Sequence, residues 1–521
     1  MPSRQASKPA GRQEEDVLPR LRLRSAPAQV AGGLAAAAGS GVLLSLANPP
    51  PDLGFVAFFA MLPLLWAARE ARPRRAALFG LTFGLTYYGI LLYWLLPFGV
   101  IAWLPVVLTQ AAYAALFGWL LPVLWDETRL IRSALLAAAL WTAVDWVRGV
   151  WPVGGFTWGG LGYTQHDNSW LLPLASVAGV WGVTFVVFAV NALLLGALLT
   201  ARRAQMVAAA MAAGGVALVL APSVIQLPAA TGPAVDTAIV QGNVPLRLAH
   251  DRFLQSRAVG ENHISLHRDL RANPPDLAVW PENALDEDPA RNRALRRRVS
   301  AAIRSVGAQA LVGTITEGPG DRFYNQTLLY AEDGSIVGRY TKTHLVPFGE
   351  YIPFRSVLGW TNRFRRTARE LTPGSTLNLF DVAGVRLGAP ICFENAYPDL
   401  FRRFVARGAN MMVVSTNDSS FLRTVASREH VMMSQLRAVE TGRWIVHAAI
   451  SGHSAFIDPE GQVVARTPLF TRTILQREVP TSTERTLYVR FGDWLPLIAG
   501  LAAVVGVALG VRKRMRRPDA S

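Results

Sequence analysis

Cysteine and charge are both scarce in this sequence. Its 521 residues include one cysteine, Cys392, so no disulfide can form within the chain and any extracytoplasmic part must be held together by packing. Charged residues make up 17% and hydrophobic residues 51%, with a mean hydropathy of +0.26. These proportions exclude a disordered chain and a typical soluble protein. The single thiol therefore needs an explanation as chemistry or as core.

Long apolar stretches fill most of the first 225 residues, after a basic arm over 1–27 that has no apolar periodicity. About 20 residues of helix cross a bilayer core, and eight stretches approach that length. Asp145 and Arg148, three apart in the fifth stretch, share a helical face and are expected to pair inside a bundle. We expect membrane spans near 28–47, 54–68, 76–96, 99–125, 133–151, 171–200, 206–222 and 495–511.

The basic excess is distributed as a membrane topology requires. Lys and Arg number 52 against 36 Asp and Glu, for a net charge of +16, which by itself also suggests nucleic acid or anionic lipid. With the N-terminus inside, the predicted inside segments carry 19 Lys and Arg, whereas the short outside loops carry none. Because basic residues accumulate in cytoplasmic loops, both termini are expected to be cytoplasmic. A nucleic-acid partner is not expected.

The segment 225–493 is richer in charged residues than the apolar stretches before it, and the topology above places it outside the cytoplasm. Short β-branched runs, such as Leu277–Trp280 and Met411–Ser415, alternate with helical patterns at Asn292–Val306 and Ser427–Gly442. Strand, helix, strand in sequence indicates an α/β domain. The predicted organisation is therefore a basic arm (1–27), a helical bundle (28–224), the α/β domain (225–493), a last span (494–511) and a basic tail (512–521).

Three polar positions in this domain carry candidate chemistry. Glu282 directly follows an apolar run, Cys392 ends another, and Lys342 lies among apolar and aromatic neighbours. Each has a plain alternative: a solvated turn acid, a small buried hydrophobe and a surface lysine, with His344 a structural histidine. Together they form a coherent set, namely a thiol nucleophile, a carboxylate base and a cation for a tetrahedral intermediate. No Cys/His spacing suggests zinc.

Over about 234–480 these residues resemble the carbon–nitrogen hydrolase, or nitrilase, superfamily, in which Glu, Lys and Cys follow separate strands in this order. Within it the whole chain is similar to the apolipoprotein N-acyltransferase family. The likeness rests on the segment Gln241–Pro245, on Trp-Pro-Glu at 280–282, on the Lys-x-His-Leu-Val-Pro-Phe-Gly-Glu run from Lys342, and on Ile-Cys-Phe-Glu at 391–394. The resemblance implies an αββα domain carried by a polytopic α-helical membrane bundle.

Carried over by position, the family's nucleophile falls on Cys392, its base on Glu282 and its third catalytic residue on Lys342. Glu350 and Glu394 match acids that support the lysine or the substrate amine. Two positions depart from the family: Phe393 stands where Tyr is frequent, and His250 where an aromatic Trp is frequent. Asn325 and Trp280 complete the residues expected to support the site or bind substrate.

The resemblance implies a two-step acyl transfer through a Cys392 thioester, from a phospholipid to the α-amino group of a diacylglyceryl-apolipoprotein, without metal or diffusible cofactor. It further implies an enzyme of the bacterial inner membrane with its catalytic domain on the periplasmic face, expected to act as a monomer. Two other interpretations are a membrane-anchored amidase for small amides and a transporter with an accessory domain. The basic, aromatic segment Phe354–Arg369 is a candidate lipid-entry lid, and the Gly- and aromatic-rich loop Trp151–Trp170 is a candidate lining of the lipid cleft.

Overall fold

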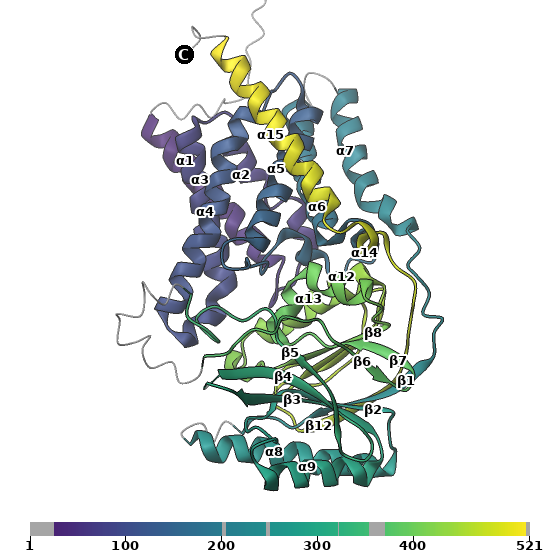
Figure 1. The fold of residues 1–521 in the computed structure, drawn as a ribbon. Coiled ribbons are helices and arrows are strands. Elements are labelled where there is room, and N and C mark those ends of the chain that lie inside the picture. The colour runs from purple at the N-terminus through teal and green to yellow at the C-terminus, as the bar shows by residue number, and fades with distance from the viewer. Residues whose placement is uncertain (1–25, 201–204, 246–250, 321, 354–369, 517–521) are drawn as a thin grey trace, which may run out of the picture.

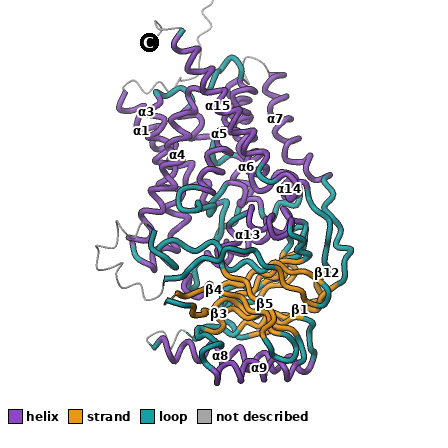
Figure 2. Tube along the Cα trace, viewed as in Figure 1, coloured by secondary structure: helices purple, strands orange, loops and turns teal. Residues whose placement is uncertain are grey.

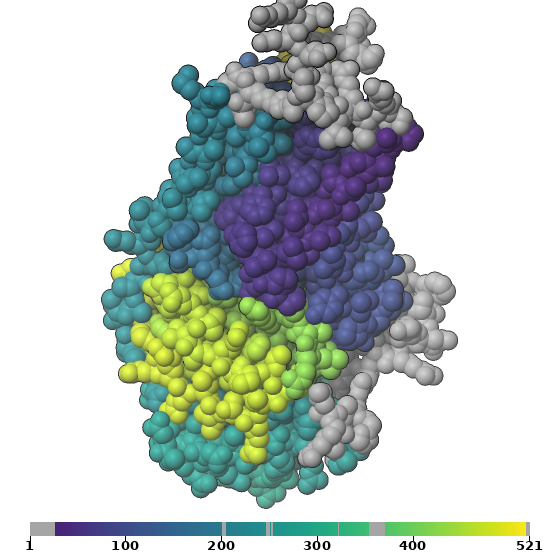
Figure 3. Space-filling model, turned by 180° about the vertical axis from the view of Figure 1, so that it is seen from behind, coloured from purple at the N-terminus to yellow at the C-terminus, as the bar shows by residue number. Residues whose placement is uncertain are grey.

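A computed structural model describes residues 26–200, 205–245, 251–320, 322–353 and 370–516, and shows a helical bundle stacked end-on against an α/β part (Figure 1). The candidate lid and His250 both lie outside the described residues. Seen from behind, the two parts form one continuous body (Figure 3). The helical bundle and the α/β domain predicted from the sequence are both present.

Seven helical segments of the described chain are long and apolar enough to cross a membrane, six before the sheets and one after them. The second predicted span, 54–68, is a 3₁₀ turn, η1 (Gly54–Phe58), followed by the short helix α2 (Leu62–Ala68). At about 1.5 Å per residue, neither piece alone is long enough to span a bilayer core. Together they still carry the chain from one end of the bundle to the other, because Asp52 pairs with Arg428 of the α/β part while Arg69 pairs with Glu127 at the opposite end. The long helices are α1 (Ala26–Leu46), α3 (Pro73–Leu91), α4 (Val100–Leu124), α5 (Leu130–Val150), α6 (Ala175–Thr200), α7 (Gln205–Leu220) and α15 (Trp494–Met515).

Small residues and one buried ion pair hold the bundle together. A Cβ at Gly80 of α3 would lie 2.1 Å from the carbonyl oxygen of Ala114 in α4, so only glycine allows this close crossing. The predicted pair in α5 is present, with Arg148 Nη2 2.7 Å from Asp145 Oδ1 and both side chains buried. Arg148 also donates to the carbonyl oxygens of Phe156 and Trp158, at 2.8 and 2.9 Å. The pair therefore fixes the loop that leaves α5.

Twelve strands of the α/β part form two six-stranded sheets that pack face to face. The first has the order β12-β1-β2-β3-β4-β5 and the second β11-β10-β9-β8-β7-β6. The first contains β1 (Ala234–Gln241), β2 (Leu277–Leu285), β3 (Gln309–Gly318), β4 (Arg322–Tyr330), β5 (Ile336–Thr341) and β12 (Thr473–Pro480). The second contains β6 (Leu379–Val382), β7 (Val385–Gly388), β8 (Met411–Thr416), β9 (Ile445–Ala449), β10 (Ala455–Ile457) and β11 (Val463–Arg466).

The central strands are apolar on both faces because each face is covered. In β2, Leu277 and Val279 join the core between the sheets, while Ala278 and Trp280 join a second core under the outer helices. This period-two division is what a strand buried on both sides requires. The outer helices are α8 (Arg252–Asp269) and α9 (Arg293–Val306). The apolar face of α9, formed by Val299, Ala302, Ile303 and Val306, follows the helical pattern predicted for 292–306.

The helices α12 (Pro398–Ala406) and α13 (Ala426–Thr441) lie between the second sheet and the bundle, so the order of layers is helix, sheet, sheet, helix, bundle (Figures 1 and 2). Every described residue of α13 from Ala426 to Thr441 except Arg428 is buried. Although it is buried on all sides, α13 carries the polar residues Glu429, His430 and Glu440. Each of them has a hydrogen-bond partner on a neighbouring segment, as buried polar groups require. This layer brings the bundle up to the ends of the strands.

Candidate active site

Glu282, Lys342 and Cys392 converge from three strands. Glu282 lies in β2 within the irregular stretch between Trp280 and Leu285, where the pairing with β3 shifts its register. Lys342 is the first residue after β5, and Cys392 begins η8 (Cys392–Ala396), the turn that follows β7. Ligands in α/β folds bind beyond such strand ends. Residues that are 60 and 50 positions apart in the sequence are thereby gathered in one place.

The carboxylate of Glu282 is buried and held by three donors. Its Oε1 accepts from Asn325 Nδ2 at 2.6 Å and from Lys342 Nζ at 3.3 Å, and its Oε2 accepts from the backbone N–H of Asn417 at 2.8 Å. The residue is 4% exposed. Such hydrogen bonds hold a carboxylate in one orientation and stabilise its ionised form. The alternative of a solvated turn acid is therefore wrong for Glu282.

Lys342 is 1% exposed, so it is not a surface lysine. Its Nζ lies 2.8 Å from Glu350 Oε1 and 3.3 Å from Glu282 Oε1. Burial alone lowers the pKa of Lys342, but the carboxylates of Glu282 and Glu350 outweigh it and hold the pKa well above its ordinary value. The ammonium is therefore permanently charged, which suits a stabiliser of negative charge and excludes a neutral amine base.

Cys392 occupies a strained turn. Its φ is 54°, in the left-handed region that costs a non-glycine residue on the order of 1–3 kcal/mol. Its side chain is partly exposed. Burial of the sulfur and the nearby Glu282 carboxylate raise the pKa of the Cys392 thiol well above its usual range, more than Lys342 lowers it. The thiol is therefore protonated at rest and needs a base to become a nucleophile.

Glu394 ties the cysteine turn to the lysine loop. Its Oε2 accepts from the backbone N–H of Ile391 at 2.7 Å. Its Oε1 accepts from the backbone N–H of Thr343 at 2.7 Å and from that of His344 at 3.0 Å. Tyr340 donates to the same carboxylate at 2.9 Å. Glu394 is 0% exposed and touches the neighbours of both Cys392 and Lys342, so it holds the two loops in register.

The remaining predicted residues divide into two groups. Asn325 and Glu350 join the site, since Asn325 Nδ2 lies 3.2 Å from Glu350 Oε1 in addition to its bond to Glu282. Trp280 does not face it: the indole is 0% exposed, packs against the rings of His263 and His267, and donates to His267 Nδ1 at 3.2 Å. Residues two apart in a regular strand face the same side, but the irregularity after Trp280 lets its side chain and that of Glu282 face different sides of the sheet. Trp280 therefore packs behind β2 and is not brought together with the other predicted site residues.

The loop Trp151–Trp170, expected at the membrane interface, docks onto the cysteine turn. Phe393 stacks with Trp158, with ring centroids 6.0 Å apart and planes at 10°, and with Phe156 at 5.8 Å and 24°. Thr157 Oγ1 donates to the carbonyl oxygen of Ala396 at 2.7 Å. The bundle thus forms one wall around the turn that carries the thiol.

A second polar layer was missed from the sequence because its members are dispersed. Thr416, at the end of β8, lies with its Oγ1 3.3 Å from Cys392 Sγ. Asp418 and His430 lie next to it, with His430 Nδ1 3.0 Å from Asp418 Oδ1. With His447 they bring three possible metal ligands within 4.8 Å, but the facing atoms of Asp418 and His430 are already bonded to each other. We interpret them as a hydrogen-bonded pair.

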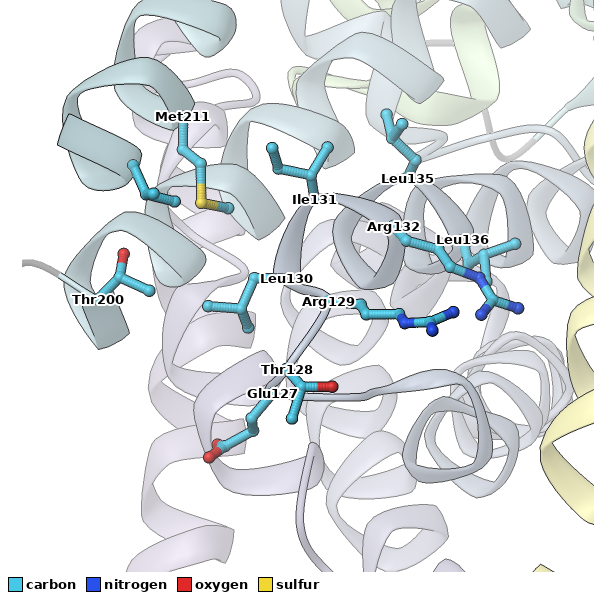
Figure 4. A pocket seen from close by; sticks show the side chains of 11 residues that line it. Glu127, Thr128, Arg129, Leu130, Ile131, Arg132, Leu135, Leu136, Thr200 and Met211 are labelled. Atoms are coloured by element: carbon cyan, nitrogen blue, oxygen red, sulfur yellow. The ribbon is translucent and has the colours of Figure 1, made fainter. Parts of the chain in front are cut away.

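A hollow of about 680 Å³ lies elsewhere, at the bundle end remote from the sheets. It opens between α5, α6 and α7 and is lined by Arg129, Arg132, Leu135 and Met211 among others (Figure 4). None of the catalytic candidates lines it. This hollow is therefore separate from the candidate active site, which lies at the strand ends.

Comparison with known proteins agrees with this division of the chain. The family model of the apolipoprotein N-acyltransferase N-terminal domain matches residues 40–193, and that of carbon–nitrogen hydrolases matches 199–488. Apolipoprotein N-acyltransferase of Geobacter metallireducens is 31% identical over 91% of this chain and 94% of its own length. That of Azotobacter vinelandii is 33% identical over 92% and 95%. The structure of Saccharomyces cerevisiae Nit3, of the nitrilase superfamily, aligns with a TM-score of 0.37 and 18% identity over 49% of this chain and 93% of Nit3.

The fold and the site define a carbon–nitrogen hydrolase domain carried by a bundle of membrane helices, a class of multi-pass membrane enzyme. Within that class, the chain belongs to the apolipoprotein N-acyltransferase family.

Proposed function

We propose that the protein transfers a fatty acyl group from a phospholipid to the α-amino group of an S-diacylglyceryl-cysteine at the N-terminus of an apolipoprotein. Membership of the N-acyltransferase family supports the reaction class. One observation carries the assignment of the site: Lys342 Nζ contacts the carboxylates of both Glu282 and Glu350, next to the chain's one thiol. A base, a fixed cation and a nucleophile are the groups that acyl transfer requires.

In the first step Glu282 accepts the Cys392 proton and the thiolate attacks an ester carbonyl of the phospholipid. The ammonium of Lys342 and backbone N–H groups of the turn stabilise the oxyanion. Collapse of the tetrahedral intermediate breaks the ester bond, and Glu282 returns its proton to the leaving lysophospholipid alkoxide. The raised pKa of the Cys392 thiol explains why a carboxylate base is needed at this position.

In the second step the free amine of the acceptor attacks the Cys392 thioester. Glu282 accepts the amine proton, and the C–S bond breaks with the Cys392 thiolate as leaving group. Glu282 then returns the proton to the sulfur, and the N-acylated lipoprotein leaves. Water must be excluded while the thioester waits, because hydrolysis would waste the acyl group. The apolar wall supplied by Phe156 and Trp158 around Phe393 supports this exclusion. Phe393 contributes its ring to that wall and has no hydroxyl with which to contact the amine.

The bundle brings the thiol to substrates that cannot leave the bilayer. We infer that the α/β part lies on the periplasmic face and that both termini are cytoplasmic, because Lys and Arg are confined to alternate loops of the bundle. The site then opens at the outer leaflet, at the depth of the acyl esters. No interface with a second copy is needed to complete the site, so a monomer suffices.

Mass spectrometry of the purified protein after incubation with phosphatidylethanolamine tests this function. A fatty-acyl mass on the peptide that contains Cys392 is expected, and it is discharged by a diacylglyceryl-peptide with a free amine. The variant Cys392→Ala should acquire no adduct, and an N-acetylated acceptor peptide should fail to discharge it. Adducts formed with small amides, and with no phospholipid tested, would replace this function by that of a membrane-anchored amidase.

A further inference from the structure

Three buried polar residues adjoin Cys392 and have no role in the two steps above. Thr416, Asp418 and His430 are at most 1% exposed and come from β8, the loop after it and α13. Thr416 Oγ1 lies 3.3 Å from Cys392 Sγ and 2.9 Å from Asp418 Oδ1. His430 Nε2 lies 3.2 Å from the carbonyl oxygen of Cys392. The cluster therefore touches both the sulfur and the backbone of the proposed nucleophile.

His430 faces an acceptor with each ring nitrogen: Asp418 Oδ1 with Nδ1 and the Cys392 carbonyl with Nε2. A neutral imidazole has one N–H, so both bonds are made in full when the ring carries two protons. Burial raises the pKa of the Asp418 carboxyl, but the charge of His430 and the hydrogen bond from it prevail and lower the pKa to about 2. His430 and Asp418 thus form a buried hydrogen-bonded pair beneath the turn.

Thr416 Oγ1 also lies 3.3 Å from His430 Nδ1, which is no acceptor when it donates its own proton to Asp418. The single hydroxyl proton of Thr416 then has two acceptors, Asp418 and the sulfur. The hydroxyl can donate to Asp418 or to the sulfur at any moment, but not to both. A neutral thiol is a weak acceptor, so the shorter contact to Asp418 is favoured at rest. Asp418 keeps two other donors if Thr416 turns away, because His430 bonds Oδ1 and Ser427 Oγ donates to Oδ2 at 2.7 Å. The hydroxyl is therefore free to follow the charge on the sulfur.

We propose that Thr416 is a further catalytic residue, whose hydroxyl turns from Asp418 to Cys392 Sγ whenever the sulfur carries negative charge, and that Asp418 and His430 are the positioning residues that hold it there. The proposal rests on the proposed function, in which Cys392 is the nucleophile. No proton leaves Thr416: the thiol proton goes to Glu282, and only the partner of the hydroxyl changes. The same bond assists the second step, where the thiolate is the leaving group.

The charge on the sulfur is influenced from several elements, so each must be kept constant in a test. Glu282 in β2, Lys342 after β5, Asp418 after β8 and His430 in α13 surround it. His447 in β9 stands against His430, with ring centroids 5.3 Å apart. The variant Thr416→Val removes the hydroxyl, keeps the branched shape that a buried strand favours and leaves all these groups in place. Thr416→Ser restores the hydroxyl.

Because Cys392 is the one cysteine of the chain, alkylation of the full-length protein by iodoacetamide reports its thiolate directly. A hydrogen bond to an ionised group is worth tenfold or more in the equilibrium. Thr416→Val should therefore alkylate about tenfold more slowly than wild type at pH 8, with its rate–pH profile displaced upward by about one pH unit. Thr416→Ser should stay within about threefold of wild type. Acyl-enzyme formation from phosphatidylethanolamine should follow the same order.

Thr327→Val is the matched control, since Thr327 is a buried strand threonine whose hydroxyl has no hydrogen-bond partner among the described residues. His430→Gln keeps a donor toward the Cys392 carbonyl but loses the link to Asp418, and should show a smaller displacement of the profile. If the Thr416→Val and wild-type profiles coincide, Thr416 has no such role. Absence of a fatty-acyl adduct on the wild-type protein would count against the proposed function instead, because alkylation needs no acyl donor.

Discussion

The indole of Trp158 and the ring of Phe393 lie parallel, 6.0 Å apart, across the boundary between the bundle and the catalytic turn. Trp158 Nε1 also donates to Glu429 Oε2 of α13 at 2.7 Å. Burial raises the pKa of this Glu429 carboxyl to about 8, more than the Trp158 bond lowers it. One bundle residue therefore contacts both the residue after the nucleophile and a buried acid of the helix behind it.

Trp158→Ala is expected to lower acyl-enzyme formation at least tenfold and to lower the thermal midpoint of the detergent-solubilised protein. Truncation of a fully buried aromatic costs about 3–5 kcal/mol, and Glu429 loses its donor. Trp158→Phe keeps the stack and should retain more activity. Trp119→Ala serves as the control, because Trp119 is 51% exposed on α4. Equal losses at Trp158 and Trp119 would show that the stack has no special importance.

Gly313→Ala is expected to displace Glu282. A Cβ at Gly313 would lie 2.2 Å from the carbonyl oxygen of Pro281 and 2.7 Å from the Cα of Glu282, so β2 must move. A shift of about 1 Å at a catalytic group can cost on the order of 100-fold in rate. Initial rates of acyl-enzyme formation measure the loss. Gly260→Ala, in α8, meets atoms no nearer than 3.7 Å and should remain within about twofold of wild type.

Glu394→Gln should weaken both loops of the site. The carboxylate accepts with both oxygens, whereas the amide of glutamine has one oxygen and one NH2 group. Either the Ile391 N–H or the Thr343 N–H would therefore face the NH2 group, which is itself a donor. A buried donor left without an acceptor costs about 1–3 kcal/mol, which should appear as a lower thermal midpoint. Activity should fall further than that of a variant of equal stability elsewhere, such as Leu328→Ala in β4. An active, fully stable Glu394→Gln protein would contradict the role assigned to this carboxylate.

Much of this architecture could be predicted from the sequence because the hydrophobic pattern of a short segment is enough to indicate a strand or a helix. The run at 277–280 indicates a strand and the pattern at 292–306 a helix, and both are present as β2 and α9. Edge strands such as β5 and β11 were missed, since their half-exposed patterns carry a weak apolar signal. The segment 54–68 is apolar, as predicted, but it crosses the bundle as a 3₁₀ turn and a short helix and not as one long helix.

Prediction of the site was limited by contacts between distant residues. Glu282, Lys342 and Cys392 were identifiable because they follow apolar runs and match a known pattern, and their contacts agree with a shared site. Thr416 and His430 stand in ordinary strand and helix patterns, and their position near Cys392 depends on the packing of α13 under the second sheet. Trp280 matched the same pattern as Glu282, yet the bulge between them turns it into the core.

The contact of the bundle with α13 should also depend on pH, through His166. Its Nε2 lies 3.2 Å from Asp167 Oδ2 and 3.6 Å from Asp52 Oδ2, and Asp52 also pairs with Arg428 of α13. Burial lowers the pKa of His166, but the bonds to Asp167 and Asp52 outweigh it and raise the pKa to about 9. An unfolded histidine titrates near 6.5, so the folded state binds the extra proton between about pH 6.5 and 9.

Because the folded pKa of His166 is the higher one, its contribution to stability is complete below about pH 6.5 and is lost as pH rises through 9. Thermal unfolding of the detergent-solubilised protein should show a midpoint for wild type several degrees above that of His166→Gln at pH 6. The two midpoints should converge by about pH 10. A difference that stays constant over this range would mean that His166 stabilises the interface by packing alone, without its charge.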